Sequence, residues 1–352
     1  MISDFEYRPD DAKIYREELD GRLPERIYDS HVHLWAKDNL NIPRSEYAMH
    51  KQYKPWTDFD YMEEFLYEDY LHCAETAFPS RQVQPLVFGS PFPQIDRDRT
   101  NRYILNTAAA SHVPFFYIPG QFEDLFETES RLHLTQLPGF LGLKPYPDIP
   151  KVEGREAGIY DMLNRSALEY ADRHNLYIVL HLPRKARLRA EENRRELLEC
   201  LRDYPNARII LAHVGRAFTY YDAEGVLDFL FPHENLLFDT ALLNSETVLE
   251  YLMRHVSADR ILFGSDAPLA FSRGKDVTIN NHHYYVSEQM VPWGLGPMQP
   301  GFAHFTFYIY EELRAMLYAS KAVYGSGEAA ALEKMLFQNA AQILRARNVP
   351  IA

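Results

Sequence analysis

Short apolar runs rich in β-branched and aromatic residues alternate along the chain with longer amphipathic runs. This alternation is typical of parallel strands joined by helices. Eight runs are predicted as strands: Arg26–His31, Gln82–Phe88, Val113–Ile118, Phe140–Pro145, Tyr177–Leu182, Arg208–His213, Asn235–Asp239 and Arg260–Ser265. Helices are predicted at about Asp58–Thr76, Arg97–Ser111, Asp124–Gln136, Gly158–His174, Ala190–Asp203, Asp222–Phe231, Ser245–His255, Phe305–Ser320 and Gly327–Arg345.

The number and order of these elements predict an α/β fold, a (β/α)₈ TIM barrel. An open doubly wound sheet is the alternative, but such sheets usually contain fewer strands. We expect one barrel domain over residues 1–352, with an N-terminal extension at 1–25 and a C-terminal helix at 327–346.

Two stretches without a clear period follow the first and eighth strands, at Trp35–Thr57 and Ala267–Gly301. Long loops in compact domains are usually functional or disordered. All three tryptophans, Trp35, Trp56 and Trp293, fall in these stretches, which favours ordered lids. In a barrel both loops would stand at the C-terminal face, where active sites are built.

Composition narrows the possible partners of the chain. It has 352 residues, 46% hydrophobic and 25% charged, with a formal net charge of −13. Such an acidic chain lacks the positive field that holds nucleic acid, so we expect a small-molecule partner instead. The sequence contains no run of about 18 apolar residues, so no membrane-spanning segment is predicted. Two cysteines cannot build a disulfide framework and the N-terminus is acidic, so the expected location is the cytoplasm.

The sharpest local signal is Asp29-Ser-His31-Val-His33 at the end of the first predicted strand. Residues two apart on a strand point to the same side, so both imidazoles could meet one metal ion. Neutral imidazole suits zinc, iron and nickel. An HxH pattern alone is weak evidence, because most such patterns arise by chance.

Further metal-competent or charged residues stand at the ends of other predicted strands: Lys144, His181, His213 and Asp266. Each has an ordinary explanation, since a lone His is usually a core residue and a lone Asp usually a turn cap. A lysine inside an apolar strand is less ordinary, because burying an unpaired ammonium is costly. Strand C-termini converge at one mouth of a barrel, so the set as a whole predicts a metal centre.

This ordered set resembles the amidohydrolase superfamily, most closely the amidohydrolase-related branch that includes decarboxylases and lactonases. The resemblance runs through nearly the whole chain, over these motifs: His31-Val-His33, His181, His213, Gly264-Ser-Asp266 and Asn339-Ala.

The resemblance implies metal ligands at four positions: His31, His33, His181 and Asp266. His213 matches a histidine that binds a second metal in binuclear members and polarises substrate in mononuclear ones. Lys144 takes the place of a bridging lysine that is carbamylated in binuclear members; it could instead pair with Asp266 or a substrate carboxylate. We expect one Zn²⁺, with a second ion if Lys144 is carbamylated.

The expected activity follows from the ion, which lowers the pKa of bound water from about 16 towards about 7. Asp266 would move the proton and His213 would stabilise developing oxyanion charge. We expect a metal-dependent hydrolase that cleaves an amide or lactone bond in a small anionic molecule. A non-oxidative decarboxylase on the same site is the alternative. A non-catalytic scaffold is disfavoured because every ligand position is filled, and family habit suggests a homodimer.

Four further residues are candidates for substrate binding: Arg184, Arg216, Tyr146 and His283. The two arginines follow His181 and His213 by three positions, and each could grip a carboxylate or phosphate bidentately. Alternatively, each is a loop arginine paired to a surface acid. Trp35, His282 and Trp293 are weaker candidates for substrate or lid contacts.

Overall fold

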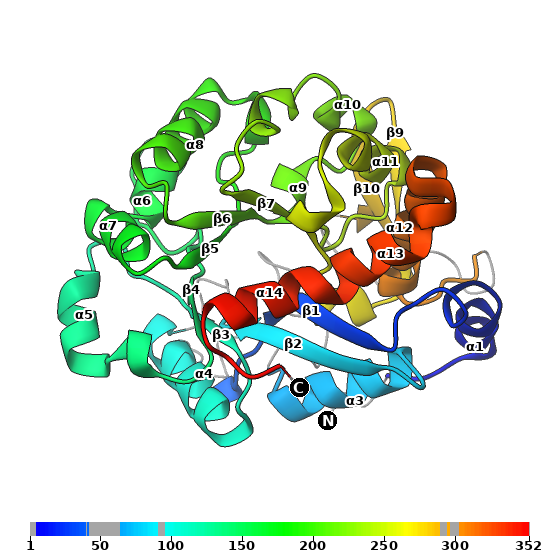
Figure 1. Cartoon of the computed structure of the whole chain (residues 1–352), viewed down its shortest axis with the longest axis horizontal. Helices are drawn as coiled ribbons and strands as arrows, with labels where there is room; N and C mark the ends of the chain where they lie inside the picture. Colours follow the sequence, from blue (N-terminus) through cyan, green and yellow to red (C-terminus); the bar gives the residue numbers. More distant parts are fainter. Residues whose placement is uncertain are drawn as a thin grey trace.

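Eight parallel strands, hydrogen-bonded in chain order, form one sheet that curls into a nearly closed barrel (Figure 1). The computed structural model describes residues 5–39, 41, 64–90, 96–288, 294–295 and 303–351. The predicted (β/α)₈ fold is therefore confirmed. The strands are β1 (Arg26–His33), β2 (Gln82–Phe88), β3 (Phe115–Tyr117), β4 (Phe140–Leu143), β5 (Tyr177–Leu180), β6 (Arg208–Leu211), β7 (Leu236–Asp239) and β8 (Ile261–Leu262).

The ring is completed by backbone hydrogen bonds between β1 and the chain that follows β8. The amide of Asp266 donates to the carbonyl of His31 at 2.9 Å, and the amide of His33 donates to Ala267 at 3.1 Å. This seam therefore places Asp266 beside the two histidines of β1 through main-chain geometry alone.

Alternate residues of each strand face opposite sides of the barrel wall. In β5, Ile178 and Leu180 pack outward against the helices, whereas Val179 packs inside the barrel. The last helical segment closes one end of this interior, where Phe337 stacks on Tyr28 with ring centroids 5.4 Å apart. Figure 1 shows α14 (Asn339–Ala346) lying across β1 and β2 at this end. The inward-facing residues at the opposite end of the barrel are therefore available to form a functional site.

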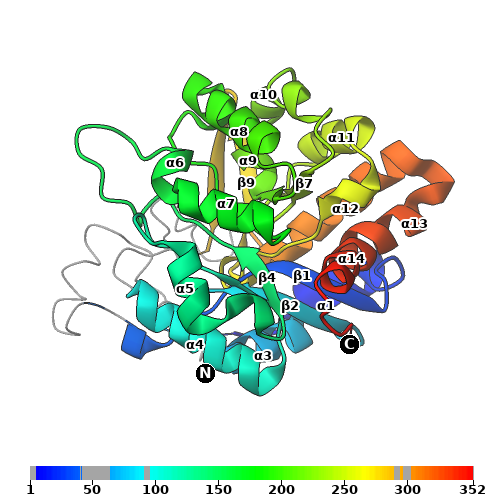
Figure 2. The ribbon, with the colours of Figure 1, turned by 60° about the vertical axis from the view of Figure 1, so that its left-hand side comes forward.

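Helices flank the outside of the barrel (Figure 2), apart from α14, which lies across one end, and the short α9 (His213–Arg216), which carries His213 into the site. They are α1 (Pro9–Ile14), α3 (Tyr67–Ala77), α4 (Arg97–Ser111), α5 (Leu125–Leu132), α6 (Ile159–Met162), α7 (Arg165–Arg173), α8 (Glu191–Asp203), α9 (His213–Arg216), α10 (Tyr220–Ala223), α11 (Glu246–His255), α12 (Tyr308–Tyr324), α13 (Glu328–Glu333) and α14 (Asn339–Ala346). A π-helical turn at Lys334–Gln338 joins α13 to α14, so the predicted C-terminal helix is continuous.

Several predicted helices differ in extent from those observed. The helix expected at Asp58–Thr76 begins at Tyr67, and residues 58–63 lie outside the described residues. The helix expected at Asp222–Phe231 is replaced by α10 and a 3₁₀ turn at Asp228–Leu230, because Gly225 between them adopts a φ of +69°. The helix expected at Gly158–His174 is divided into α6 and α7, where the Asn164 side chain caps the second helix by accepting from the amide of Ala167. A capping side chain favours a new start over continuation.

The long stretch after β8 contains a hairpin, β9 (Gly274–Ile279) with β10 (His282–Ser287), extended by the short strand β11 (Gly294–Leu295). Asn280 and Asn281 form its tip with φ of 51° and 64°, as a tight two-residue hairpin turn requires. This part of the predicted lid is ordered. Of the tryptophans, Trp35 is fully buried in the outer core and so is not a lid contact; Trp56 and Trp293 lie outside the described residues.

The N-terminal extension holds the base of this hairpin. Arg273, just before β9, forms a buried ion pair with Asp11 at 2.6 Å. Glu288, just after β10, pairs with Arg8 at 2.7 Å. One ion pair lies at the start of the hairpin and the other at its end. The extension therefore fixes the direction in which the hairpin leaves the barrel.

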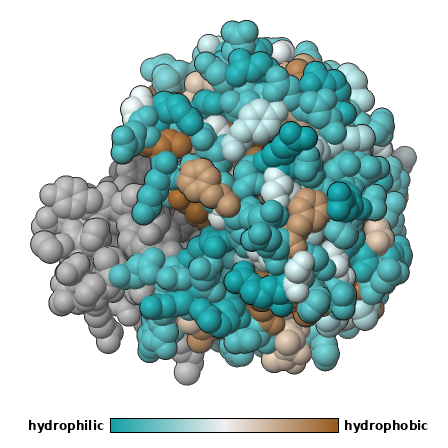
Figure 3. Space-filling model, turned by 90° about the vertical axis from the view of Figure 1, so that its left-hand side faces the viewer, coloured by the Kyte–Doolittle hydropathy of each residue, from teal (hydrophilic) through white to brown (hydrophobic). Residues whose placement is uncertain are grey.

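One face of the molecule is mostly hydrophilic where the structure describes it. On the side of the molecule in Figure 3, apolar side chains are scattered among hydrophilic ones. Among the described residues, no helix combines the length and apolar character needed to cross a bilayer. Single exposed apolar residues are normal on a globular protein.

Candidate metal centre

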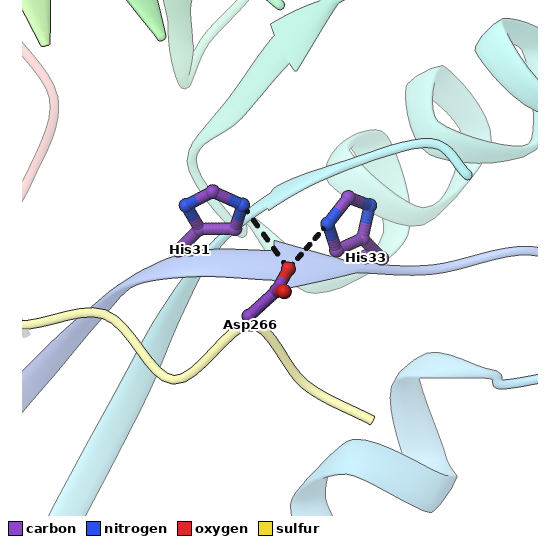
Figure 4. A group of neighbouring side chains, drawn as sticks. All are labelled: His31, His33 and Asp266. Carbon is purple, nitrogen blue, oxygen red and sulfur yellow. Dashed lines mark hydrogen bonds and ion pairs between the residues drawn. The ribbon is translucent and has the colours of Figure 1, made fainter. Parts of the chain in front are cut away.

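His31, His33 and Asp266 converge at the seam between β1 and the end of β8 (Figure 4). Asp266 Oδ1 lies 2.7 Å from His33 Nε2 and 3.2 Å from His31 Nε2. One ligand atom from each of the three residues lies within 4.8 Å of the others, and all three are buried. The sequence prediction for these three residues therefore agrees with their placement in space.

The other ring nitrogen of each histidine is held by an acceptor. His31 Nδ1 bonds to the carboxylate of Asp239. His33 Nδ1 lies 3.2 Å from the carbonyl of Gly89 and 3.1 Å from the hydroxyl of Tyr146. A carboxylate or carbonyl can only accept, so Nδ1 of each ring carries a proton. Nε2 of each ring faces the Asp266 carboxylate and would offer its lone pair once a cation lies between them. This is the usual arrangement of histidines that bind a metal.

The backbone of Gly264 lies close to the side chains of His31 and Asp239. A Cβ atom on Gly264 would stand 2.7 Å from Cβ of His31 and 3.1 Å from Oδ1 of Asp239. Only glycine fits between these two side chains without displacing one of them. The glycine of the Gly264-Ser-Asp266 motif thus has a steric reason to be there.

Asp239 was missed by the sequence analysis, although a signal existed. It ends β7 after Leu236-Leu-Phe, and Leu237 faces the barrel interior. Two positions later, Asp239 must face inward as well. A fully buried carboxylate at the same level as the histidines marks it as part of the site.

Replacing Asp239 by asparagine is expected to weaken metal binding by about 10–100-fold, because the hydrogen bond that orients His31 loses its charge. The measurement is titration of Zn²⁺ into metal-free protein. Asp203→Asn, at an exposed ion pair on α8, serves as the control and should bind metal normally. Unchanged affinity in Asp239→Asn would contradict the orienting role.

His213 reaches the site through an unusual backbone. In β6, Ile210 faces the interior, and so does Ala212, so regular alternation would turn the next residue outward. Instead, residues 213–216 all have positive φ, at 55°, 49°, 68° and 63°, which makes α9 a left-handed turn. Such a turn costs about 1–2 kcal/mol per non-glycine residue. Strain of this kind persists mainly at functional positions.

The left-handed turn brings His213 among the other histidines. Its ring centroid lies 4.9 Å from that of His31 and 5.3 Å from that of His181. Its Nδ1 is 2.8 Å from the carbonyl of Ala241, so Nδ1 carries the proton and Nε2 is left with the lone pair. Burial lowers the pKa of His213 to about 4.

His181 lies beside the three-residue group rather than within it. Its Nδ1 is buried and has no hydrogen-bond partner among the described residues. Burial, together with the neighbouring charges of His213 and Arg216, lowers its pKa well below the usual value. Burying an imidazole nitrogen without a hydrogen-bond partner costs free energy, and a metal ion or substrate that bound this nitrogen would remove the cost.

Lys144 is fully buried at the same centre. Its Nζ lies 3.2 Å from His31 Nε2 and 4.5 Å from the centre of the Phe88 ring. Burial lowers its pKa to about 8, against the opposing charges of Asp239 and Asp266. Lys144 thus lies beside His31, and its bridging role as a carbamate stays a prediction, with a paired ammonium as the alternative.

The two arginines predicted to bind substrate differ sharply. Arg184 Nη2 bonds to Glu196 at 2.6 Å, and its Nη1 contacts both Glu196 and Asn193. Arg184 is therefore a paired loop arginine, the alternative considered for it above, although its partner is buried and not on the surface.

Arg216 has no such partner. Its Nη1 contacts two backbone carbonyls, of Leu182 at 3.2 Å and Arg184 at 3.3 Å, and no carboxylate among the described residues lies within ion-pair distance. Burial, together with the charge of Arg187, lowers its pKa to about 10. A mostly buried cation without a counter-ion is a natural place for an anionic ligand.

The remaining predicted contacts are occupied within the protein. The hydroxyl of Tyr146 donates to Gly89 at 2.8 Å and supports His33. His283, on β10, has its Nε2 2.8 Å from Asp276 and its ring stacked on Phe218 at 4.6 Å. Tyr146 thus lies at the centre, whereas Phe218 stands between His283 and the centre.

Glu312 of α12 is a second buried acid that sequence reasoning missed. Its Oε1 accepts from the Thr240 hydroxyl at 3.1 Å. Burial raises its pKa well above the usual value, and the charge of nearby Asp239 adds to the effect. The folded protein therefore keeps this carboxyl protonated at a pH where the unfolded chain has lost the proton.

Glu312→Gln is expected to become more stable than the parent protein as pH rises. Above the unfolded pKa, holding the proton costs the folded parent up to about 1.4 kcal/mol per pH unit, until the folded pKa is reached. Glutamine has no proton to lose, so the two proteins should converge near pH 4 and diverge towards pH 7. Chemical denaturation at several pH values measures this, with exposed Glu192→Gln as the control. A difference in the free energy of unfolding that does not change with pH would contradict a protonated Glu312 in the folded protein.

The fold and site define a TIM-barrel protein with a histidine–carboxylate group at the C-terminal mouth of the barrel. A family model described as Amidohydrolase matches residues 28–346. The chain therefore belongs to the amidohydrolase family, and this part of the sequence prediction is confirmed.

Solved structures with the same fold include two decarboxylases and a hydratase. 5-Carboxyvanillate decarboxylase from Sphingomonas paucimobilis aligns with a TM-score of 0.55 at 13% identity, over 92% of this chain and 99% of that one. 2,6-Dihydroxybenzoate decarboxylase from Rhizobium gives 0.51 at 13%, over 92% and 99%. 4-Oxalomesaconate hydratase from Rhodopseudomonas palustris gives 0.52 at 14%, over 92% and 96%. No curated protein matches the chain.

Proposed function

We propose that the chain is a metal-dependent hydrolase that cleaves a C–N or C–O bond, as in an amide or lactone, of a small anionic molecule. The observation that carries the proposal is the convergence of His31, His33 and Asp266 within 4.8 Å, with both histidines presenting Nε2. Ligands of this kind are what zinc and similar divalent ions prefer.

The residues fit such an ion by their chemistry. His31, His33 and Asp266 would hold it, and the unpartnered His181 would supply a further nitrogen. One Zn²⁺ is the proposed cofactor, and a second ion would require carbamylation of Lys144. When bound, the ion supplies Lewis acidity and lowers the pKa of water. A metal-to-protein ratio of one or two separates these alternatives.

Protons are handled by the chain's own side chains. Asp266 accepts a proton from the attacking water and returns it to the leaving group, since it is the carboxylate at the centre of the group. His213, with its proton on Nδ1, presents a lone pair at Nε2. This favours a ligand or acceptor role for His213 over the oxyanion donor role expected from its family position.

Arg216 supports an anionic substrate. Its guanidinium is largely buried, and among the described residues the only groups that its side-chain donors contact are the two backbone carbonyls near Nη1. A carboxylate placed there would gain charge-assisted hydrogen bonds while its reacting bond lies towards His181 and His213.

The test is a panel of carboxylated lactones and amides incubated with protein reconstituted with Zn²⁺, Mn²⁺ or Fe²⁺. Metal content is measured in parallel by elemental analysis. Metal-dependent release of acid or amine is the expected result. Stoichiometric metal without hydrolysis of any compound would argue against the hydrolase, and absence of bound metal under replete conditions would argue against the whole proposal.

A non-oxidative decarboxylase is the second candidate. Unpaired Arg216 could hold the carboxylate of such a substrate, and two proteins of the same fold carry decarboxylase names. Carbon dioxide release from carboxylated aromatic compounds, with no hydrolytic product, would favour this reaction over hydrolysis.

A further inference from the structure

A cavity of about 580 Å³ lies outside the candidate metal centre, and no residue of the centre lines it. It lies between the tip of the β9–β10 hairpin and the loops that follow β5 and β6. All three segments follow the C-terminal ends of barrel strands, so the cavity is at the mouth of the barrel. We call it the outer pocket. Its size is within the range of small-molecule sites.

The lining of the outer pocket is basic although the chain is acidic overall. Lys185, Arg187 and Arg189 face a single carboxylate in the lining, Asp222. Asp222 lies 3.4 Å from Arg187 and 3.8 Å from Arg189, and no carboxylate among the described residues pairs with exposed Lys185. A positive pocket in a chain of net charge −13 concentrates anions locally.

The same pocket has aromatic walls that leave the cations accessible. Arg189 lies over the ring of Tyr221 at 3.8 Å, which orients its guanidinium. Tyr221 is half exposed, at 52%. An ordered guanidinium beside a flexible lysine is well suited to an oxyanion, because the first binds in a fork and the second as a point charge.

One aromatic ring connects the outer pocket to the metal centre. Phe218 stacks on His283 of the pocket at 4.6 Å and lies 6.2 Å from His213 of the centre. Arg187 sits over the same ring at 5.2 Å and lowers the pKa of buried Arg216 by its charge. Positive groups therefore continue from the centre to the pocket around Phe218.

We propose that the outer pocket binds an oxyanion group, carboxylate or phosphate, that the substrate carries away from its reacting bond. Lys185 and Arg189 make the contacts, and Arg187 contributes charge while its Nη1 bonds to the carbonyl of Arg216. Placing this group on the substrate rests on the proposed function, whereas anion binding by the pocket does not.

Isothermal titration calorimetry with inorganic phosphate, and separately with succinate, tests the pocket on the full chain at low salt. Saturable binding that depends on Lys185 and Arg189 is expected, in addition to any binding at Arg216 or the metal centre. Lys185→Gln/Arg189→Gln should bind about 100-fold more weakly, because one charge-assisted hydrogen bond is lost at each residue and each is worth about tenfold. Whichever of the two anions binds more tightly identifies the chemical source. Arg195→Gln/Lys321→Gln removes the same charge at exposed sites elsewhere and should bind as the parent does.

Two further variants separate the pocket from its surroundings. Lys185→Glu changes one exposed side chain, so it tests the pocket even if loss of Arg189 disturbs the loop. His31→Ala should retain phosphate binding, because the outer pocket does not depend on the metal centre. The proposal is overturned by any of three results: no saturable binding, equal loss in the control pair, or loss in His31→Ala with retention in the pocket variants.

The two proposals fail in different ways. Phosphate or succinate binding that depends on Lys185 and Arg189, in a protein that turns over no compound of the panel, upholds the pocket and rejects the hydrolase. Turnover of a panel compound, without anion binding that depends on Lys185 and Arg189, upholds the hydrolase and rejects the pocket. In an active enzyme, the pocket variant should raise KM for substrates with a distal anionic group and leave KM unchanged for those without one.

Discussion

Asparagine in place of Asp266 is expected to reduce kcat by about 10²–10⁴-fold, the range that general acid–base groups contribute. Burial alone would raise the pKa of Asp266, but the charges and hydrogen bonds of His31 and His33 hold it well below the usual value. The carboxylate is therefore ionised at neutral pH and can accept a proton. Asparagine has nearly the same shape but cannot accept that proton.

The measurement must separate proton transfer from metal loss, because Asp266 is also a proposed ligand. Steady-state kinetics should be compared at equal metal content, determined for each preparation. KM is expected to change little, since Asp266 acts on the reacting proton and not on the anionic group at Arg216. An unchanged kcat with metal retained would remove Asp266 from the proton-transfer role. Asp203→Asn controls for the loss of a charge at an exposed site.

The parts of the site that follow from strand periodicity could be predicted from the sequence. His31 and His33 are two apart on β1, so they share a face, and an irregularity of β1 between Asp29 and Val32 turns that face inward. His181 follows inward Val179 by two positions, so regular alternation alone turns it inward. The same argument applied to β7 would have found Asp239. The barrel could be predicted for the same reason, because the order of strands and helices follows from the local sequence pattern.

Features that depend on tertiary contacts or on unusual backbone could not be predicted in this way. Regular alternation would turn His213 outward, and only the left-handed turn of α9 brings it into the site. Nothing in the local sequence distinguishes Arg184 from Arg216, since their difference is that Glu196 of α8 reaches only the first. The β9–β10 hairpin had a local signal, the Asn280–Asn281 pair between alternating residues, but it was hidden in an apparently aperiodic loop.

His31→Ala is expected to abolish stoichiometric metal binding, and with it turnover. His31 occupies the middle of the centre: Nε2 faces Asp266 and Lys144, and Nδ1 bonds to Asp239. Alanine removes one ligand and leaves two buried carboxylates beside the ammonium of Lys144. These opposite charges can pair directly, which further opposes binding of a cation. The loss of affinity should exceed the about 10–100-fold expected for Asp239→Asn, which only orients the ligand.

Elemental analysis after dialysis against a chelator, followed by reloading with Zn²⁺, measures this loss directly. His304→Ala is the matched control, because its side chain is 76% exposed and lies outside the centre. Circular dichroism verifies that the barrel still forms. If His31→Ala bound one equivalent of metal as tightly as the control, the lone pairs that converge at the β1–β8 seam would not be the ligands. The proposed chemistry would then lose its geometric basis, because no other group of three such side chains among the described residues lies close enough to share an ion.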